Sequence, residues 1–230
     1  MNSPLEHILV VGGGTAGWLT AAVLAAGHNA SLESGIRVTL IESPDVNTIG
    51  VGEGTWPSMR DTLRKIGVSE RDFIRECSAS FKQGSKFVGW RNGDDEEFYY
   101  HPFSLPHGYL NANVVPYWQA EHPDISLASA FSSQEALCQL GKAPKQAQTP
   151  EFAAVANYAY HLDAGKFATF LQKHCTQKLG VRHVLDHVTQ VKPAANGDIA
   201  ALATKQSGDL PADLFIDCTG VASLLLGKHY

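Results

Sequence analysis

The stretch ILVVGGGTAG, residues 8–17, decides the fold of this chain. Four apolar residues that end at a run of glycines are typical of a buried strand in a parallel sheet. The Ala- and Leu-rich residues from Thr15 to about Ala26 predict a helix directly after the glycines, and the β-branched run Arg37–Ile41 predicts a second strand. Strand, helix and strand in this order predict an α/β fold around a parallel central sheet.

The glycines have the spacing of a dinucleotide-binding loop. Gly12 permits a tight turn, Gly14 lets the backbone approach a pyrophosphate, and Gly17 lets the helix pack closely on the strand. The free N–H groups at the helix N-terminus would face the phosphates. Glu42 ends the second strand, where an acidic side chain accepts hydrogen bonds from a ribose. The alternative is a glycine-rich turn that binds no nucleotide, which the surrounding strand, helix and acid disfavour.

The other elements follow from periodicity and from residues that start or stop helices. Helices are expected at Pro57–Ile66, Ser69–Ser80 and Asp163–Leu179. Ser69 and Asp163 are start signals for the second and third of these helices, and Gly180 is a stop signal for the third. Strands are expected at Lys86–Trp90, Glu97–Tyr100, Val181–Leu185, Val188–Lys192, Ile199–Thr204 and Leu214–Asp217. The pair Asn196-Gly197 predicts a hairpin turn, so a β-hairpin or meander should accompany the parallel sheet.

Residues 98–157 show poor periodicity and many prolines, so we expect an irregular insertion there. Ser132–Leu140 is the exception, because Ser132 and Glu135 have the spacing of a capping box at a helix start. Aromatic side chains are dense at the beginning of this region. They either pack in a core or form a flat apolar pocket for a planar ligand, and they are Tyr99, Tyr100, His101, Phe103, Tyr109, Tyr117 and Trp118.

Composition excludes several classes of function. The net charge is −5, so no global basic character points to nucleic acid or to an anionic membrane. The four cysteines form no CxxC pair and predict free thiols in a reducing cytoplasm. The apolar stretch from Ile8 to Ala26 is too short and too rich in glycine to span a membrane. His183 and His187 lie on an expected strand and loop, so no metal site is expected.

The residues alone do not decide the role of two further features. The glycine-rich loop Ile49–Thr55 is either a plain connection or a segment that runs along a cofactor. Lys82 and Lys86 are flanked by Phe81 and Phe87. A lysine is usually a solvated surface charge, but in an apolar pocket its amine can become neutral and nucleophilic.

Several motifs together resemble the N-terminal part of flavin-dependent tryptophan halogenases. They are VVGGGTAGWLTAAVL, VTLIES, IGVGEGTWPSMRDTL, SFKQGSKFVGW, YYHPF, NYAYHLDAGKFATFL, VRHVLDHVTQV and DLFIDCTGVASLLLG, in the order of the family. The resemblance implies FAD, received as FADH2 from a separate flavin reductase, which with O2 and chloride or bromide gives hypohalous acid. The residues it implies for FAD binding are Gly12, Gly14, Thr15, Ala16, Gly17, Glu42, Gly50, Val51, Gly52, Glu53, Val188, Thr219 and Gly220.

The resemblance also implies which residues face the substrate. Lys82 matches the catalytic lysine of the family, which holds the halogen as a haloamine or orients hypohalous acid by hydrogen bonding. His101 and Phe103 lie where family members stack an indole ring, so the implied substrate is an indole or a tryptophan-like aromatic. The alternatives are a flavin-dependent monooxygenase or oxidase in which Lys82 is structural, and an FAD-binding chain without catalysis.

The chain departs from the family in length. Family members are about twice as long, and this chain stops before their WxWxIP motif, catalytic glutamate and halide-binding loop. We therefore expect a truncated chain, and the resemblance leaves its activity in isolation open. Residues 1–230 should form a single Rossmann-like FAD-binding domain. Residues 98–157 should be the substrate-side insertion within it. Apolar surface left uncovered would favour a homodimer.

Overall fold

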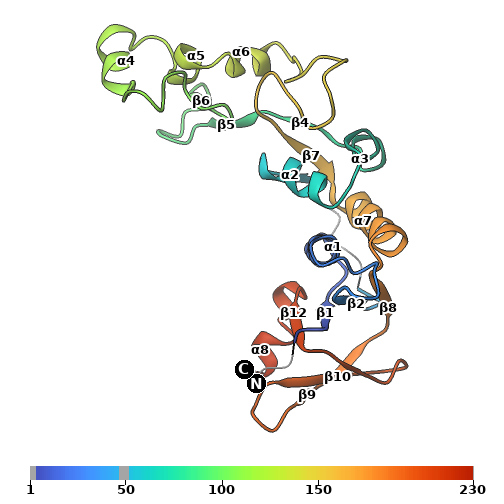
Figure 1. Ribbon diagram of the computed structural model, residues 1–230. Coiled ribbons are helices and arrows are strands. Elements are labelled where there is room, and N and C mark those ends of the chain that lie inside the picture. Colours follow the sequence, from blue (N-terminus) through green and yellow to red (C-terminus); the bar gives the residue numbers. More distant parts are fainter. Residues whose placement is uncertain (1–3, 47–51, 230) are drawn as a thin grey trace. The chain divides into compact units, whose positions relative to one another are not determined.

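The chain divides into two compact units that are linked by several crossings of the backbone (Figure 1). The computed structural model describes residues 4–46 and 52–229. Unit 1 comprises Met1–Gly52, Thr62–Ser78 and Asp163–Tyr230, and unit 2 comprises Glu53–Asp61 and Ala79–Leu162. The expectation that residues 1–230 form a single domain stays a prediction, and each unit is described by itself.

A four-stranded parallel sheet forms the centre of unit 1. Its strand order is β12 (Leu214–Asp217), β1 (His7–Val11), β2 (Arg37–Glu42) and β8 (Arg182–Leu185). Each neighbouring pair is parallel, so all four strands end at the same edge of the sheet. The predicted α/β fold with a parallel central sheet is therefore confirmed.

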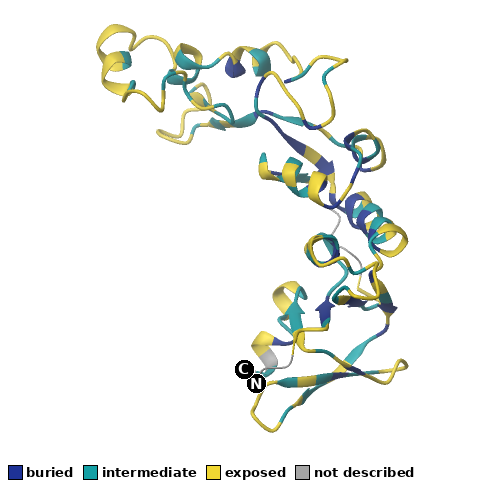
Figure 2. Cartoon of the chain, viewed as in Figure 1, coloured by how far each residue is buried: buried dark blue, intermediate teal, exposed yellow. Residues whose placement is uncertain are grey.

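Helices cover one face of this sheet. Helix α1 (Thr15–Gly27) contacts β1 and β2 and packs against α7 (Ala164–Lys178), which in turn contacts α3 (Glu70–Glu76). Buried residues line β1 and one side of α7 (Figure 2). Asp163 caps α7 by accepting a hydrogen bond from the Lys166 N–H, as the sequence predicts. Helix α3 has the predicted Ser69 cap but ends at Glu76, earlier than expected.

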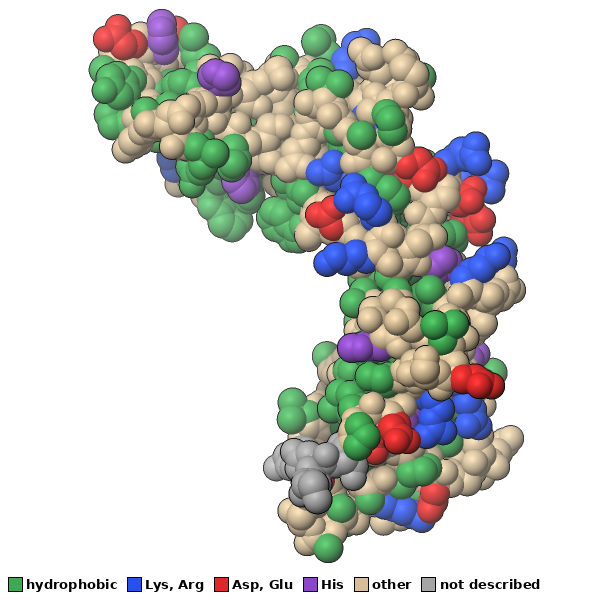
Figure 3. Space-filling model, viewed as in Figure 1, with side chains coloured by type: hydrophobic (Ala, Val, Ile, Leu, Met, Phe, Trp, Pro, Cys, Tyr) green, Lys and Arg blue, Asp and Glu red, His purple; other side chains and the backbone are tan. Residues whose placement is uncertain are grey.

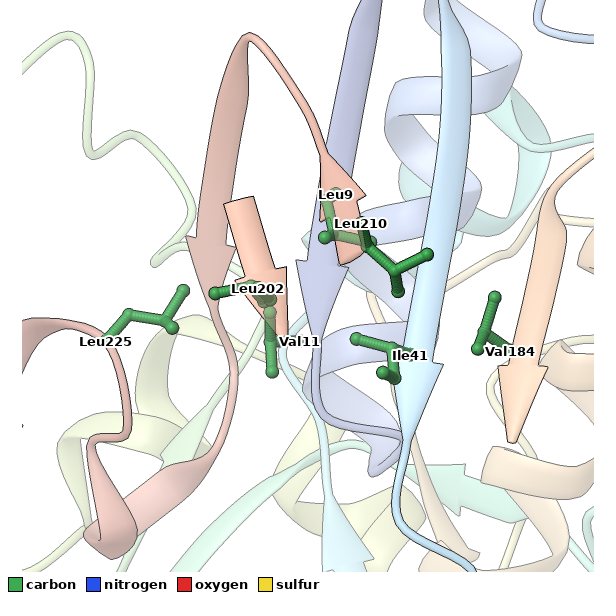
Figure 4. Close-up of a cluster of buried hydrophobic side chains, with 7 residues drawn as sticks. All are labelled: Leu9, Val11, Ile41, Val184, Leu202, Leu210 and Leu225. Carbon is green, nitrogen blue, oxygen red and sulfur yellow. The ribbon is translucent and has the colours of Figure 1, made fainter. Parts of the chain in front are cut away.

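An antiparallel meander covers the other face of the sheet. Its strands are β9 (Val188–Pro193), β10 (Ile199–Thr204) and β11 (Asp209–Pro211). Between the two sheets lies a cluster of buried side chains, which are Leu9, Val11, Ile41, Val184, Leu202 and Leu210 from the strands and Leu225 from the segment before α8 (Figure 4). Burying one such side chain contributes about 1.5–3 kcal/mol, so this layer is a main source of stability in unit 1.

Unit 2 contains a small three-stranded sheet with the order β3 (Gly52–Gly54), β7 (Ala159–Asp163) and β4 (Ser80–Lys82). A hairpin of β5 (Gly84–Val88) and β6 (Phe98–Pro102) follows β4 along the chain. The hairpin confirms the two strands predicted near Lys86–Trp90 and Glu97–Tyr100, with bounds shifted by up to two residues. Strands β3 and β7 are not expected from the sequence, because neither has a pattern of alternating apolar residues long enough to read.

The segment predicted to be irregular, residues 98–157, contains three short helices. They are α4 (Val115–Glu121), α5 (Leu127–Phe131) and α6 (Gln134–Gln139). The predicted capping box is wrong, because Glu135 accepts hydrogen bonds from Ser126 at 2.5 Å and from Gln139 at 3.1 Å. Ser132 caps only Gln134, and α6 begins two residues later than predicted.

The remaining elements are the helix α2 (Ser58–Lys65), the 3-10 turn η1 (Gly220–Ala222) and the helix α8 (Leu226–His229). Within residues 4–46 and 52–229, none of the helices combines the length and the apolar character needed to cross a membrane.

Asp217 closes the turn that follows β12. One carboxylate oxygen accepts hydrogen bonds from the Thr219 N–H at 3.0 Å and hydroxyl at 2.6 Å. The other accepts from the N–H groups of Leu225 at 2.8 Å and Leu226 at 3.1 Å. Burial by itself would raise the pKa of Asp217, but these hydrogen bonds outweigh it and the pKa is lowered.

We expect Asp217→Asn to destabilise the chain by about 1–3 kcal/mol at pH 7, because the amide nitrogen cannot accept the bonds that one carboxylate oxygen receives. The lowered pKa means that this stabilisation is complete above the unfolded-state value of about 4 and is lost as pH falls through the folded-state pKa. Urea unfolding at several pH values measures both effects, and the difference between wild type and variant should shrink in acid.

Asp209→Asn is the matched control, because Asp209 pairs with Lys192 at 2.6 Å on the exposed surface of the meander. Such pairs contribute at most about 1 kcal/mol. Equal losses in the two variants would contradict a special role for the Asp217 turn.

Candidate functional site

The loops that follow the parallel strands of unit 1 are held together at one edge of the sheet. The N–H of Gly12 donates to the carbonyl of Ile41, and the N–H of Cys218 donates to the carbonyl of Val11, both at 2.8 Å. The C-terminal ends of β12, β1 and β2 are thus in register with one another. In open α/β sheets this carboxyl edge is where ligands bind.

Two glycines of the first loop are required by the backbone itself. Gly12 has a φ of +115°, and a Cβ there would lie 2.3 Å from the carbonyl oxygen of Cys218. A Cβ at Gly17 would lie 1.8 Å from the carbonyl oxygen of Gly12. These contacts give Gly12 and Gly17 the conformational roles that their spacing predicts.

The N-terminus of α1 is free of partners from the described chain. Gly14 is its N-cap and offers no side-chain cap, and a Cβ placed there would meet nothing within 4 Å. The hydroxyl oxygen of Thr15 is buried without a hydrogen-bond partner among the described residues. Ala16 is exposed beside it. Free N–H groups, the helix dipole and an unpaired hydroxyl fit a phosphate-bearing ligand.

Glu42 lies beside the same loop. One of its carboxylate oxygens is 2.8 Å from His183 Nε2 and accepts a hydrogen bond from Gln172 Nε2 at 3.2 Å. The other oxygen lies over Gly13, where a Cβ would come within 1.4 Å of it. Gly13 is the variable position of the motif, so sequence reasoning missed its role, and the run of three glycines is the only signal for it.

The other residues expected at this site differ in their surroundings. Thr219 belongs to the Asp217 turn, and Gly220 follows it with a φ of +61° and open space around its Cα. Val188 begins β9 and packs, partly buried, against the core cluster. These placements leave their contact with a cofactor a prediction.

Part of the expected cofactor loop is outside the described residues. Gly50 and Val51 lie in the undescribed segment 47–51. Gly52 and Glu53 belong to β3, where Gly52 is exposed and Glu53 is half-buried. Their role beside a cofactor stays a prediction.

Lys82, the last residue of β4, is the centre of a second site in unit 2. Its Nζ lies 5.5 Å from the ring centroids of both Trp56 and Phe103. The two rings are in contact, with centroids 5.6 Å apart. A lysine within about 6 Å of an aromatic face is attracted to it. Phe103 is therefore beside Lys82, as expected, and Trp56 is a neighbour that sequence reasoning missed.

His161 on β7 faces the same side of the small sheet as Lys82, because it pairs with Ser80 two residues before the lysine. A Cβ at Gly54 would lie 3.2 Å from Lys82 Nζ and 3.4 Å from His161 Nδ1. The pKa of His161 is lowered, first by partial burial of its ring and then by the positive charge of Lys82. His161 was also missed, because its strand was not foreseen.

The expected aromatic cluster does not converge on one pocket. His101 lines a cavity of about 790 Å³ with Tyr99, Tyr100 and Trp118. Lys82 and His161 line a different cavity of about 470 Å³. Tyr109 and Tyr117 are exposed, with exposed fractions of 58% and 71%. Figure 3 shows hydrophobic side chains at the surface over the part of unit 2 that holds β5, β6 and α4.

His183 Nε2 on β8 lies 2.8 Å from a Glu42 carboxylate oxygen but has no hydrogen-bond partner among the described residues, and His187 Nε2 lies 2.9 Å from Asp45. No group of three or more His, Cys, Asp or Glu side chains that could hold a metal ion occurs in the described segments 4–46 and 52–229. The four cysteines are free thiols, as predicted, and burial raises the pKa of Cys175 to about 12.

Comparison with known proteins identifies close relatives along the whole chain. The family model described as tryptophan halogenase matches residues 7–229. Tryptophan 7-halogenase RebH of Lentzea aerocolonigenes is 33% identical, and tryptophan 6-halogenase ThaL of Streptomyces albogriseolus is 34% identical. Each alignment covers 99% of this chain and 45% of the relative, so the chain spans less than half the length of these proteins.

Solved structures agree with the sequence relatives. A tryptophan halogenase from Shewanella frigidimarina NCIMB 400 superposes with a TM-score of 0.93 at 54% identity, over 99% of this chain and 45% of that one. A flavin-dependent halogenase from Xanthomonas campestris superposes with a TM-score of 0.84 at 32% identity, over 99% and 44%.

Alanine at two positions of the glycine loop should destabilise the chain by different amounts. Gly17→Ala should lower the free energy of unfolding by about 1–3 kcal/mol, because its Cβ meets a backbone oxygen that cannot move alone. Gly14→Ala should cost less than about 1 kcal/mol, because its φ of −73° suits alanine and the space is open. Thermal and urea unfolding of both variants measure this, and equal losses would contradict the geometry of the loop.

Proposed function

This chain belongs to the tryptophan halogenase family, and on that premise we propose that it binds FAD and acts in the flavin-dependent halogenation of an indole or tryptophan-like substrate. The observation that carries the proposal is the position of the Lys82 amine against the faces of Trp56 and Phe103. The relatives named above are tryptophan halogenases, and they align with almost the whole chain. The proposed lysine lies beside two aromatic rings, a setting suited to that chemistry.

The carboxyl edge of the unit 1 sheet is the proposed FAD site. The N–H groups at the start of α1, with Gly14, Thr15 and Ala16, would bind the pyrophosphate, and the unpaired Thr15 hydroxyl would donate to a phosphate oxygen. Glu42 would accept hydrogen bonds from the adenosine ribose. Bound as FADH2, the cofactor would supply the activation of O2 that converts chloride or bromide to hypohalous acid.

Further FAD contacts are proposed from the family pattern. They would come from the turn after β12, from the start of β9 and from the loop into β3, with Thr219, Gly220, Val188, Gly50, Val51, Gly52 and Glu53 as the residues involved. A separate flavin reductase would supply the reduced flavin, as the family pattern implies.

Lys82 is the proposed catalytic residue. As an ammonium it would donate a hydrogen bond to hypohalous acid and orient it. As a free amine it would form an N–halogen bond and release water, with the amine nitrogen losing a proton and gaining the halogen. The neutral imidazole of His161, whose pKa is lowered, adds no second positive charge beside Lys82 at pH 7.

The substrate is proposed to be an electron-rich aromatic ring. Phe103 and Trp56 present ring faces beside Lys82, where a planar indole would stack. His101 is the second stacking residue proposed from the family pattern, although it lines a different cavity from Lys82.

FAD binding is tested by the same substitution at the two ends of one helix. Gly14→Ala should weaken FAD binding by at least about tenfold, because its methyl group would occupy the space where the pyrophosphate approaches the helix. Gly27→Ala, at the C-terminal end of α1, also meets nothing within 4 Å and should bind FAD like wild type. Quenching of flavin fluorescence gives both dissociation constants. Equal affinities in the two variants would exclude the proposed position of the pyrophosphate.

Lys82→Met should lower halogenation by at least about 100-fold while FAD binding and flavin-dependent peroxide formation persist. Lys86→Met is the control, because Lys86 Nζ lies 4.0 Å from the Phe98 ring on the hairpin and has no proposed part in the reaction. Product is measured by mass spectrometry with a flavin reductase, halide and tryptophan or indole. Halogenation that survives Lys82→Met would refute the assignment. FAD binding and peroxide formation by wild type without any halogenated product would instead support an oxidase.

A further inference from the structure

We propose that His161 is a second binding residue for the halogenating oxidant, and that its imidazole and the Lys82 amine hold one molecule of hypohalous acid over Gly54. This inference rests on the proposed function and concerns the same cavity in unit 2. His161 would contact the oxidant directly, whereas the aromatic rings beside Lys82 would contact the substrate.

The imidazole and the amine border a space that Gly54 leaves open. A Cβ at Gly54 would lie 3.2 Å from Lys82 Nζ, 3.4 Å from His161 Nδ1 and 3.5 Å from His161 Cε1. The Nδ1–Cε1 edge of the imidazole and the end of the lysine therefore face the same point above the glycine. Because hydrogen bonds span about 2.5–3.2 Å, a molecule of two heavy atoms at this point can reach both nitrogens.

The small sheet of unit 2 places these groups. β7 is its central strand, with β3 on one side and β4 on the other. The N–H of Thr55, the neighbour of Gly54, donates to the carbonyl of Tyr160 at 2.8 Å. Tyr160 is fully buried, and successive strand residues point to opposite faces, so His161 is directed away from the core. His161 and Lys82 both line the cavity of about 470 Å³.

Neither nitrogen is occupied by the chain itself. Within residues 4–46 and 52–229, the Lys82 amine and the His161 ring make no hydrogen bond or ion pair. The pKa of His161 is lowered, first by partial burial and then by the charge of Lys82, so the ring is mostly neutral at pH 7. A neutral imidazole has one acceptor nitrogen, and an ammonium is a donor. Together they match a molecule with one O–H group and one oxygen lone pair.

The charge of the cavity favours the same kind of occupant. Its described lining includes Lys82, Lys86 and Lys142 but no Asp or Glu. An excess of positive charge attracts anions and weak acids and disfavours cations. Hypohalous acid is a weak acid of the required size, and it carries the O–H donor that the acceptor nitrogen of His161 needs.

With its O–H group held by His161, the rest of the oxidant would lie against Lys82. An ammonium there would donate to the oxygen. A free amine would form the N–halogen bond as the O–halogen bond breaks, and the departing hydroxide would take the amine proton and leave as water. The imidazole is unchanged in both cases, because its part is to hold and orient the acid.

Cyanate tests this site without flavin. Isocyanic acid has an N–H donor beside an electrophilic carbon, and a lysine amine adds to that carbon to give a carbamoyl-lysine. Hypohalous acid itself is a poor probe, because the free thiol of Cys138 lines the same cavity and would consume it. Mass spectrometry of the digested protein gives the ratio of carbamylation at Lys82 to that at Lys86.

Two substitutions of similar shape separate the acceptor from the volume of the ring. His161→Asn places an amide oxygen near the position of Nδ1, and its ratio should stay within about twofold of wild type. His161→Leu has no acceptor, and its ratio should fall by at least about threefold, the value of one modest hydrogen bond. His107→Leu is the control, because His107 is an exposed histidine of unit 2 that does not line this cavity, and it should keep the ratio.

Equal ratios in the folded Leu and Asn variants would overturn this inference and leave the proposed role of Lys82 in place. Circular dichroism reports whether the variants fold. If neither histidine variant folds, Gly54→Ala decides, because it keeps both nitrogens but fills the space between them. Its ratio should also fall, and an unchanged ratio there would overturn the inference.

The full reaction provides the second measurement. With FAD, a flavin reductase, halide and indole, hypohalous acid that escapes is trapped by monochlorodimedone. His161→Leu should raise escaped oxidant per halogenated product by at least about threefold, while His161→Asn should not. Unchanged escape in His161→Leu would overturn this inference alone. Absence of both escaped oxidant and halogenated product in wild type would overturn the proposed function, and this inference with it.

Discussion

The lack of side-chain atoms in the loop between β1 and α1 is the constraint on which unit 1 depends. Gly12 meets the carbonyl of Cys218, Gly17 meets the carbonyl of Gly12, and Gly13 meets the carboxylate of Glu42, each at a distance that leaves no room for a Cβ. These contacts join the loops after β12 and β1, the start of α1 and the end of β2. The edge of the sheet and the first helix are therefore built as one piece.

The same constraint leaves the N-terminus of α1 without a cap. A Ser, Thr, Asp or Asn at the cap position would bond the first free N–H groups and would add roughly a few tenths of a kcal/mol to helix stability relative to glycine. Gly14 supplies no such bond, and the Thr15 hydroxyl is buried without a partner among the described residues. A phosphate oxygen can accept hydrogen bonds from the N–H and O–H donors that the chain leaves unpaired. The site thus exists because the fold omits a stabilising contact.

The local sequence pattern predicted the parts of the structure that depend on residues close to one another in the sequence. The strands β1, β2 and β12, the helices α1 and α7, and the glycine roles follow from runs and spacings that lie within a few residues. The site around Lys82 was beyond that reasoning, because Trp56, Phe103 and His161 come from separate segments and meet through pairing of β4 with β7. The role of Gly13 depends on the position of the Glu42 carboxylate, which accepts a hydrogen bond from Gln172 of α7, so this role could not be seen in the motif alone.

Folding and the proposed ligand binding in unit 1 depend on the same residues. Gln172 of the packed helix α7 donates a hydrogen bond to Glu42, and the backbone of Cys218 both bonds to β1 and leaves no room for a Cβ at Gly12. A ligand that binds this edge only in the folded state stabilises the fold by about 2.7 kcal/mol when its concentration is 100 times the dissociation constant. The uncapped helix and the unpaired hydroxyl lower the stability of the free chain, and the bound phosphate would satisfy both. The proposed cofactor would therefore complete the carboxyl edge of the unit 1 sheet, whereas Lys82 depends on side chains of unit 2 for its setting.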